Sequence, residues 1–311
     1  MVAAVQGPFR SWTASSPFRS DILDDRVACV TGGGSGITFE VARQLGRHGA
    51  KLCLMGRRES FLREACASLE AEGIHVRYAA GDVRKPEDCA RCIQTAVEAF
   101  GFVNVLVNGA AGMFPASAGE SLKPSGFKTV IDIDLLGTYN MCYAAYPELK
   151  KTGQSVVCNI TVPRHFMEGQ NWWVSHMQSA KAAVTTLSHS LAKEWAEFGI
   201  RVVNVAPGSI ADTPAQLKSG YTGGITAKAK EFKDGVPVNR DVPLGRHGTS
   251  FEIGMATVFL CVSEHITAET IFVDGGWWLN TGSRPLPTRE KLEQVTRGNE
   301  SQSRALKPSK L

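Results

Sequence analysis

Short apolar runs rich in β-branched residues alternate with longer amphipathic stretches along most of this chain. The predicted strands are Val27–Thr31, Lys51–Met55, Val76–Ala80, Asn104–Asn108, Ser155–Ile160, Arg201–Val205 and Thr270–Val273. The predicted helices are Thr38–Arg47, Glu59–Glu72, Pro86–Phe100, Gly126–Leu149, Ser175–Phe198 and Ser250–Cys261. Such alternation is typical of a parallel sheet whose connecting segments cover both of its faces. We therefore expect an α/β fold built on a single doubly wound parallel sheet with helices on both faces.

The length of 311 residues permits one large domain or two small ones. No change of composition interrupts residues 21–280, which favours one catalytic domain there, with an N-terminal extension (1–20) and a polar C-terminal tail (281–311). The net charge of +4 is too small to indicate a nucleic-acid partner. No apolar run approaches the roughly 18 residues that would predict a membrane span.

We examined the two ends of the sequence for targeting signals, and they differ. Residues 1–20 contain arginines and serines but no apolar core, so a secretory signal is not expected, whereas a mitochondrial presequence stays open. Ser309-Lys310-Leu311 matches a peroxisomal address when it stands at a free C-terminus, and chance is the alternative. We expect a peroxisome or related microbody, such as a glycosome, and the peroxisomal import receptor as a partner.

The eight cysteines do not form the pattern of a disulfide framework. Cys29, Cys53 and Cys158 fall inside predicted strands, where a free thiol behaves as a small buried apolar group, and this fits a reducing compartment. Cys89 and Cys92 have metal-like spacing, but no second pair follows and the segment is a predicted helix. We expect no metal site.

A glycine-rich turn joins the first predicted strand to the first predicted helix. It reads Thr31-Gly32-Gly33-Gly34-Ser35-Gly36-Ile37. In that place glycines let the backbone approach a pyrophosphate, which the N–H groups of the helix N-terminus bind. The sheet is therefore expected to be of the dinucleotide-binding Rossmann type.

The second predicted strand ends in Gly56-Arg57-Arg58, with no acid to bind a ribose 2′-hydroxyl. Two guanidinium groups pair well with a 2′-phosphate, so the expected cofactor is NADPH. The alternative is two solvated arginines that open a helix.

The spacing T-G-x-x-x-G-I resembles that of the short-chain dehydrogenase/reductase superfamily. The likeness extends, in order, through Asn108-Gly109-Ala110-Ala111-Gly112, Lys181, Pro207-Gly208 and Asp274-Gly275-Gly276, and Thr38 departs from it where a third glycine is usual. The cofactor-binding residues that the resemblance and the turn imply are Thr31, Gly32, Gly34, Ser35, Gly36, Ile37, Arg57, Arg58, Asp82, Val83, Asn108, Ala110, Lys181, Pro207, Gly208 and Ile210.

The catalytic tyrosine of the superfamily is missing. Lys181 is present, but Met177 stands one helical turn before it, and helical geometry points Ser175 and His176 away from Lys181. Thr161 takes the place of the usual serine, and Asp134 that of the usual asparagine. A buried carboxylate near an ammonium can hold or relay a proton, which an amide cannot.

With these departures from the superfamily pattern, the sequence resembles the peroxisomal 2,4-dienoyl-CoA reductases. The likeness rests on Asp132-Ile133-Asp134-Leu135-Leu136-Gly137-Thr138, on His176 ahead of Ala180-Lys181, and on the C-terminal tripeptide. It implies NADPH-dependent reduction of 2,4-dienoyl-CoA to 3-enoyl-CoA in the β-oxidation of unsaturated fatty acids. By resemblance Lys181 and Asp134 are catalytic: Lys181 also binds the nicotinamide ribose, and Asp134 positions or acidifies a proton-donating water. A helix-interior acid satisfied by local donors is the alternative for Asp134.

The substrate-binding residues expected for an acyl-CoA are Arg57, Arg84, Phe114 and Thr161. Each arginine could instead be a solvated surface group, and Phe114 could belong to the core. Residues 214–242 are expected to form a lid, with Trp172 and Trp173 in the acyl channel or at an interface.

Two other functions remain open on the sequence. One is another CoA-linked reductase, such as a trans-2-enoyl-CoA reductase, although such relatives generally keep the tyrosine. The other is a catalytically silent member that binds NADPH as a sensor or scaffold. The superfamily resemblance also implies a homo-oligomer, a tetramer built on the two longest predicted helices.

Overall fold

The computed structural model describes residues 16–163, 174–211, 213, 232–233, 236–239 and 241–279. A seven-stranded sheet with the order β3-β2-β1-β4-β5-β6-β9 forms its centre, and every strand pair in it is parallel. The strands are β1 (Val27–Thr31), β2 (Lys51–Gly56), β3 (Val76–Ala80), β4 (Val105–Asn108), β5 (Ser155–Ile160), β6 (Ile200–Pro207) and β9 (Thr270–Val273). The order runs outward in both directions from β1 and β4, which confirms the predicted doubly wound sheet.

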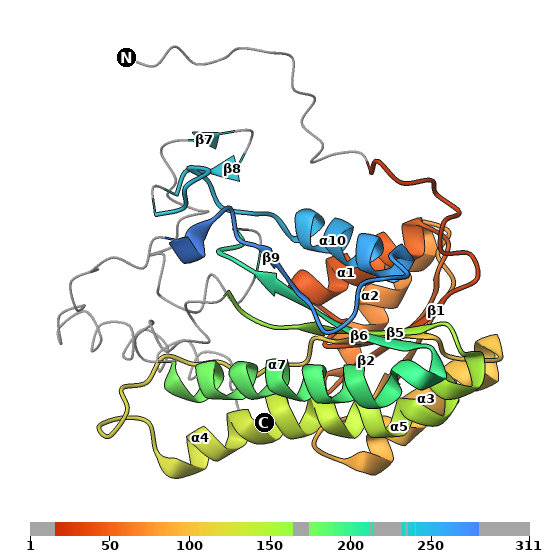
Figure 1. Ribbon diagram of the computed structural model, residues 1–311, viewed down its shortest axis with the longest axis horizontal. Helices are drawn as coiled ribbons and strands as arrows, with labels where there is room; N and C mark the ends of the chain where they lie inside the picture. The colour runs from red at the N-terminus through yellow and green to blue at the C-terminus, as the bar shows by residue number, and fades with distance from the viewer. Residues whose placement is uncertain are drawn as a thin grey trace, which may run out of the picture.

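Helices cover both faces of the sheet (Figure 1). One face carries α1 (Gly36–Arg47), α2 (Glu59–Ala71) and α10 (Ser250–Val262). The opposite face carries α3 (Pro86–Phe100), α5 (Gly137–Thr152) and α7 (Ser175–Trp195), whose last turn continues as a 3₁₀ segment, Ala196–Phe198. Two apolar cores result, one on each face.

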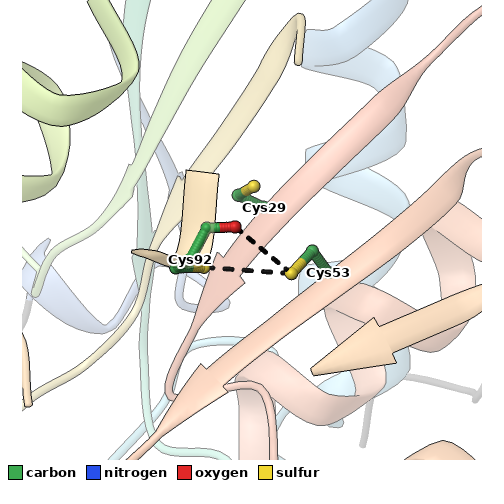
Figure 2. Close-up of side chains that lie close together, drawn as sticks. All are labelled: Cys29, Cys53 and Cys92. Carbon is green, nitrogen blue, oxygen red and sulfur yellow. Dashed lines mark hydrogen bonds between the residues drawn. The ribbon is translucent and has the colours of Figure 1, made fainter. Parts of the chain in front are cut away.

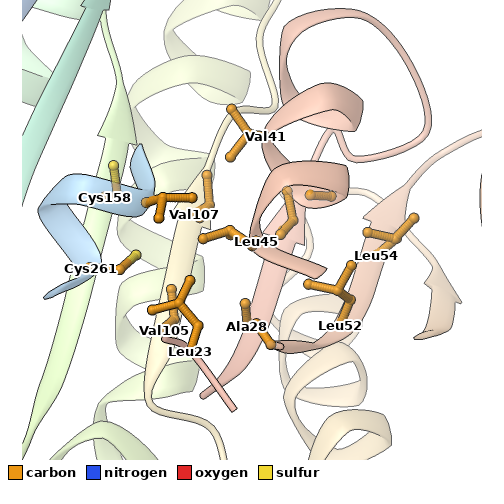
Figure 3. Packing of buried hydrophobic residues seen from close by; sticks show 14 of the residues in the cluster. Leu23, Ala28, Val41, Leu45, Leu52, Leu54, Val105, Val107, Cys158 and Cys261 are labelled. Carbon is orange, nitrogen blue, oxygen red and sulfur yellow. The ribbon is translucent and has the colours of Figure 1, made fainter. Parts of the chain in front are cut away.

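The central strands are buried on both faces, which explains why they are continuous apolar runs. All residues of β1 and β5 are buried. In the core of the α1 face, Val41 and Leu45 of α1 belong to the same apolar cluster as Ala28 of β1 and Val107 of β4 (Figure 3). On this scaffold the strand register brings Thr31 beside Asn108, and Asn108 beside Asn159, so the polar ends of β1, β4 and β5 meet at one edge.

The prediction of one continuous helix over Gly126–Leu149 is wrong, because the structure divides this segment into three parts. It consists of α4 (Pro124–Ile131), a π-helical turn (Asp132–Leu136) and α5. The hydroxyl of Thr138 donates a 2.7 Å hydrogen bond to the carbonyl of Asp134 beside this widened turn. A single π turn preserves the apolar stripe on either side of it, so the periodicity does not reveal it, and such turns are frequent at functional sites.

Smaller elements complete the described part of the chain. They are the antiparallel pair β7 (Phe232–Lys233) and β8 (Val236–Pro237) and a 3₁₀ turn, Trp277–Leu279. No helix among the described residues is both long and apolar enough to cross a membrane. Residues 1–15 of the predicted extension, Trp172 and Trp173, most of the predicted lid and the tail with Ser309-Lys310-Leu311 lie outside the described residues.

Candidate active site

The glycine-rich turn lies where β1 ends and α1 begins. Gly32 has a φ of +71°, and a Cβ on it would come within 2.9 Å of the carbonyl oxygen of Gly109. Gly36, the first residue of α1, has a φ of +65°. Both positions need glycine because side chains rarely adopt this conformation. The turn therefore leaves the N-terminus of α1 open for an anionic group.

Thr38 compensates for the glycine that the turn lacks. Its hydroxyl donates a 2.7 Å hydrogen bond to the carbonyl of Gly32. Its methyl group fills the space beside Gly109, where an added Cβ would collide with it. The turn is thus closed by a side-chain hydrogen bond, and Gly109 supplies the room that this side chain needs.

A cavity of about 400 Å³ opens at the carboxyl ends of the central strands. This is the edge at which doubly wound sheets bind their ligands. Twelve of the predicted site residues line it: Gly32, Gly34, Ser35, Gly36, Ile37, Arg57, Arg58, Asp82, Val83, Ala110, Thr161 and Lys181. The structure thus brings together in one cavity residues that the sequence spreads from 32 to 181.

Two of the predicted cofactor-binding residues support the cavity from behind rather than lining it. The hydroxyl of Thr31 accepts hydrogen bonds from the backbone N–H groups of Gly109 and Ala110, at 3.0 and 3.1 Å. The side chain of Asn108 is buried and donates a 2.9 Å hydrogen bond to Asn159. Both side chains hold the end of β4 in place.

The remaining predicted cofactor residues do not line this cavity: Pro207 ends β6, and Gly208 and Ile210 lie in the loop after it. Gly208 packs so closely on the backbone of Asp274 that a Cβ would not fit. The hydroxyl of Ser209 lies 2.8 Å from Nδ1 of the buried His247. The loop is therefore held in place by the close packing on Asp274 and by the hydrogen bond with His247.

Cations lie at the end of β2. Arg57 and Arg58 are exposed, line the cavity and have no carboxylate within ion-pair distance among the described residues; the Arg58 guanidinium stacks on Phe61 at 3.6 Å. Arg84 differs, because its guanidinium group donates hydrogen bonds to both carboxylate oxygens of Asp82. These hydrogen bonds, and the more distant charge of Arg57, hold the pKa of Asp82 below its ordinary value.

Asp134 and Lys181 form a buried ion pair behind the cavity. Lys181 Nζ lies 3.7 Å from Asp134 Oδ2 and donates a 2.9 Å hydrogen bond to the carbonyl of Ile160. The backbone N–H of Gly112 donates to Asp134 Oδ1 at 2.6 Å, whereas Oδ2 has no hydrogen-bond partner in the described part of the chain. Burial raises the pKa of Asp134, although Lys181 and Gly112 oppose the shift. Asp134 itself does not line the cavity, so its link to the cavity is Lys181.

Among the described residues, no ionisable side chain takes the place of the absent tyrosine. Met177 lines the cavity beside Lys181. The hydroxyl of Thr161 lines it too, but donates a 3.3 Å hydrogen bond to the carbonyl of Val205. Two predicted substrate-binding residues, Phe114 and Arg84, do not line the cavity, although Met113 beside Phe114 does. Phe114 is 38% exposed and is therefore not a core residue. Its ring stacks on His176, a contact that the sequence did not predict because the two residues lie on different elements.

The eight cysteines are all free and buried. Cys92 does not pair with Cys89 but lies against Cys53, with Sγ atoms 3.9 Å apart, and Cys29 completes a group within 4.8 Å (Figure 2). The three sulfurs come from β1, β2 and α3 and are fully buried in the apolar core of the α3 face. They fill the core as small, weakly hydrogen-bonding groups.

Comparison with known proteins places this geometry in a family. The family profile described as enoyl-(acyl carrier protein) reductase matches residues 32–278. A short-chain dehydrogenase from Bacillus anthracis superposes with a TM-score of 0.71 at 28% identity, covering 85% of this chain and all of that one. The chain belongs to the short-chain dehydrogenase/reductase family and is an oxidoreductase.

Within this family the chain is similar to a particular group. It is 40% identical over 301 residues to the peroxisomal 2,4-dienoyl-CoA reductase of Arabidopsis thaliana, covering 93% of this chain and 96% of that protein. A 3-ketoacyl-(acyl-carrier-protein) reductase from Brucella melitensis, solved with NADH, superposes with a TM-score of 0.71 at 25% identity over 82% of this chain and 99% of that one. The cofactor is a nicotinamide dinucleotide, which fits the open turn and the α1 N-terminus.

Proposed function

We propose that the protein reduces 2,4-dienoyl-CoA to 3-enoyl-CoA with NADPH. The observation that carries the proposal is the buried Asp134–Lys181 pair, which lies beside a cavity where Met177 takes the place of the tyrosine used by the family's carbonyl reductases. Reduction of a ketone produces an alkoxide, which the tyrosine protonates. Reduction of a conjugated thioester produces no alkoxide, so it does not need that tyrosine. The relative from Arabidopsis thaliana is named as a 2,4-dienoyl-CoA reductase, which acts on a conjugated thioester.

The residues of the cavity suit this chemistry. When bound, the reduced nicotinamide supplies a hydride to the far end of the diene. Negative charge then spreads toward the thioester oxygen, and a carbon must be protonated. Lys181 brings a cation to the cavity beside Asp134. Burial raises the pKa of Asp134, which makes its carboxylate easier to protonate, so the pair is suited to exchange a proton with a water in the cavity.

The preference for NADPH rests on Arg57 and Arg58. Both guanidinium groups lie in the cavity at the end of β2 without a carboxylate partner among the described residues, and no acid occupies the place that would bind a 2′-hydroxyl. Arg57 is also the better candidate for a CoA phosphate, because Arg84 is engaged by Asp82. Phe114 offers an exposed ring to the acyl chain.

The decisive experiment follows NADPH absorbance with purified protein and 2,4-decadienoyl-CoA. We expect NADPH oxidation with this substrate and none with simple ketones. Turnover of trans-2-decenoyl-CoA at the same rate would support the other CoA-linked reductase. NADPH binding without turnover of any dienoyl-CoA would support the silent sensor.

Location and assembly extend the proposal. The name of the Arabidopsis thaliana relative supports a peroxisomal location, and removal of Ser309-Lys310-Leu311 from a fluorescent fusion should abolish import by the peroxisomal receptor. A homo-oligomer built on α5 and α7 is supported by three exposed apolar side chains on and beside α5: Leu136, Tyr139 and Tyr143. Such a patch on a surface is typical of an interface.

A further inference from the structure

The ring of Phe114 is packed against residues of two helices, although part of it is exposed. On one side is Gly126 of α4, where a Cβ would come within 3.1 Å of the ring carbon Cζ. On another is His176 of α7, whose ring centroid lies 4.5 Å away with the two planes tilted by 38°. The Phe114 side chain is nevertheless 38% exposed. A ring that is supported from behind and still exposed is suited to contact a ligand.

His176 is an unusual choice for a purely apolar support. It is completely buried. Neither ring nitrogen meets the geometry of a hydrogen bond within the described residues, although the backbone of Phe114 lies close enough to raise the pKa of the ring against the effect of burial. Leaving a buried polar group without a partner costs stability, so phenylalanine or leucine would fill the space more favourably. Burial lowers the pKa of His176, so at neutral pH the ring stacks as uncharged imidazole.

The segment between Gly112 and Phe114 is held at both of its ends. Gly112 donates its N–H to Asp134, and Phe114 stacks on His176. Met113, between them, lines the cavity. The next residue after His176, Met177, lines the same cavity, so α7 both supports this segment and forms part of the cavity wall.

We propose that His176 is a positioning residue that sets the tilt of Phe114, and that the exposed ring receives the flat conjugated part of the acyl chain. The inference rests on the proposed function, because it names the part of that substrate which the stacked pair recognises. His176 acts through Phe114 and not on the reacting atoms. Its loss should therefore weaken the binding of conjugated acyl chains more than it slows the chemical step.

The test compares His176→Ala, His176→Phe and Phe114→Leu with His189→Ala, a control on the exposed side of the same helix. Removal of the stacking partner should raise the KM for 2,4-decadienoyl-CoA about threefold to tenfold, with kcat within a factor of about two. His176→Phe should restore the KM, since it restores an aromatic partner of similar size. In the Phe114→Leu background, His176→Ala should have no further effect.

Calorimetry of the NADP⁺-loaded protein provides a readout that does not need turnover. The preference for 2,4-decadienoyl-CoA over saturated decanoyl-CoA should shrink in His176→Ala and Phe114→Leu and persist in His176→Phe and His189→Ala. Equal preference in all variants overturns the positioning role even if wild-type protein is an active reductase. Wild-type protein that binds dienoyl-CoA with this pattern but never oxidises NADPH would instead refute the proposed activity and leave the stacked pair as the recognition element.

Discussion

The ammonium of Lys181 is held between two acceptors, the carbonyl of Ile160 at 2.9 Å and the Asp134 carboxylate at 3.7 Å. The nearer contact is to the backbone at the end of β5, so the position of Lys181 does not depend on Asp134 alone. Asp134 in turn is held by Gly112 through its other oxygen. The two groups can therefore be tested separately.

Asp134→Asn should lower kcat for dienoyl-CoA reduction about 100-fold or more, because an amide keeps the hydrogen bond from Gly112 but cannot exchange a proton. The dissociation constant for NADPH, measured by fluorescence, should change less than about threefold. Asp132→Asn is the control, since Asp132 lies in the same π turn but pairs with the exposed Lys128. Wild-type turnover in Asp134→Asn would refute the proton-handling role.

Replacement of both Arg57 and Arg58 by serine should weaken NADPH binding about 10- to 100-fold and leave NADH binding nearly unchanged, because charge-assisted hydrogen bonds to a 2′-phosphate are lost. Titrations with both cofactors measure the ratio. Arg63→Ser, an exposed arginine of α2 paired with Glu59, provides the comparison. An equal loss for NADPH and NADH would mean that these arginines do not recognise the 2′-phosphate.

Acid should destabilise the protein through its buried histidines. Burial lowers the native pKa of His176 and of His247, whereas an unfolded histidine titrates near 6.5. The unfolded chain therefore binds protons first, so the stability from neutral histidine is present above about pH 6.5 and is lost as pH falls toward the native pKa. The decrease in unfolding free energy between pH 7.5 and 5.5, measured with urea, should be smaller in His247→Leu and unchanged in the exposed-site variant His189→Leu.

The thiols should be inert in the native protein. All eight are buried, and burial raises the pKa of Cys142 and Cys261 to about 12. Hydrogen bonds with Cys29 and Cys92 lower the pKa of Cys53 to about 5, but its side chain is completely buried, so reagents cannot reach it. Ellman's reagent should report fewer than one reactive thiol per native chain and all eight after unfolding under non-reducing conditions. Rapid labelling of the native protein would show that the core around Cys29, Cys53 and Cys92 opens, and a smaller final count would reveal a disulfide.

Tyr143 is 71% exposed on α5 and should lie in the proposed subunit interface. Tyr143→Asp should reduce the molar mass found by light scattering, because a buried unpaired charge opposes association. Tyr143→Phe keeps the apolar area and should leave the mass unchanged. A wild-type protein that is monomeric, or a Tyr143→Asp variant of unchanged mass, would count against assembly through this face.

Patterns that repeat locally were predictable. The bounds of β1, β3, β5, β9 and α3 agree with the sequence expectation to the residue, because short strand-forming runs and helix-start signals such as Pro86 are encoded nearby in the chain. The glycine turn was predictable for the same reason, since its conformations require glycine whatever surrounds it.

Contacts between distant segments were not predictable from local pattern. The C-x-x-C spacing pointed to Cys89 and Cys92, but the sulfurs that meet Cys92 come from two strands. Thr38 stands where the superfamily usually has a glycine, yet it closes the turn with a hydrogen bond because Gly109, seventy-one positions later, leaves room for it. The π turn escaped prediction because one extra residue preserves the helical stripe on either side.

The sequence by itself determined the doubly wound sheet, the dinucleotide turn and the exchange of tyrosine and asparagine for Met177 and Asp134, since these depend on residue type and near spacing. Only the tertiary structure decided that Asp134 lies behind Lys181 rather than in the cavity and that His176 supports Phe114. Each of these depends on how helices pack across a sheet, where a side chain's pKa and partners follow from burial and from neighbours brought in from remote parts of the chain.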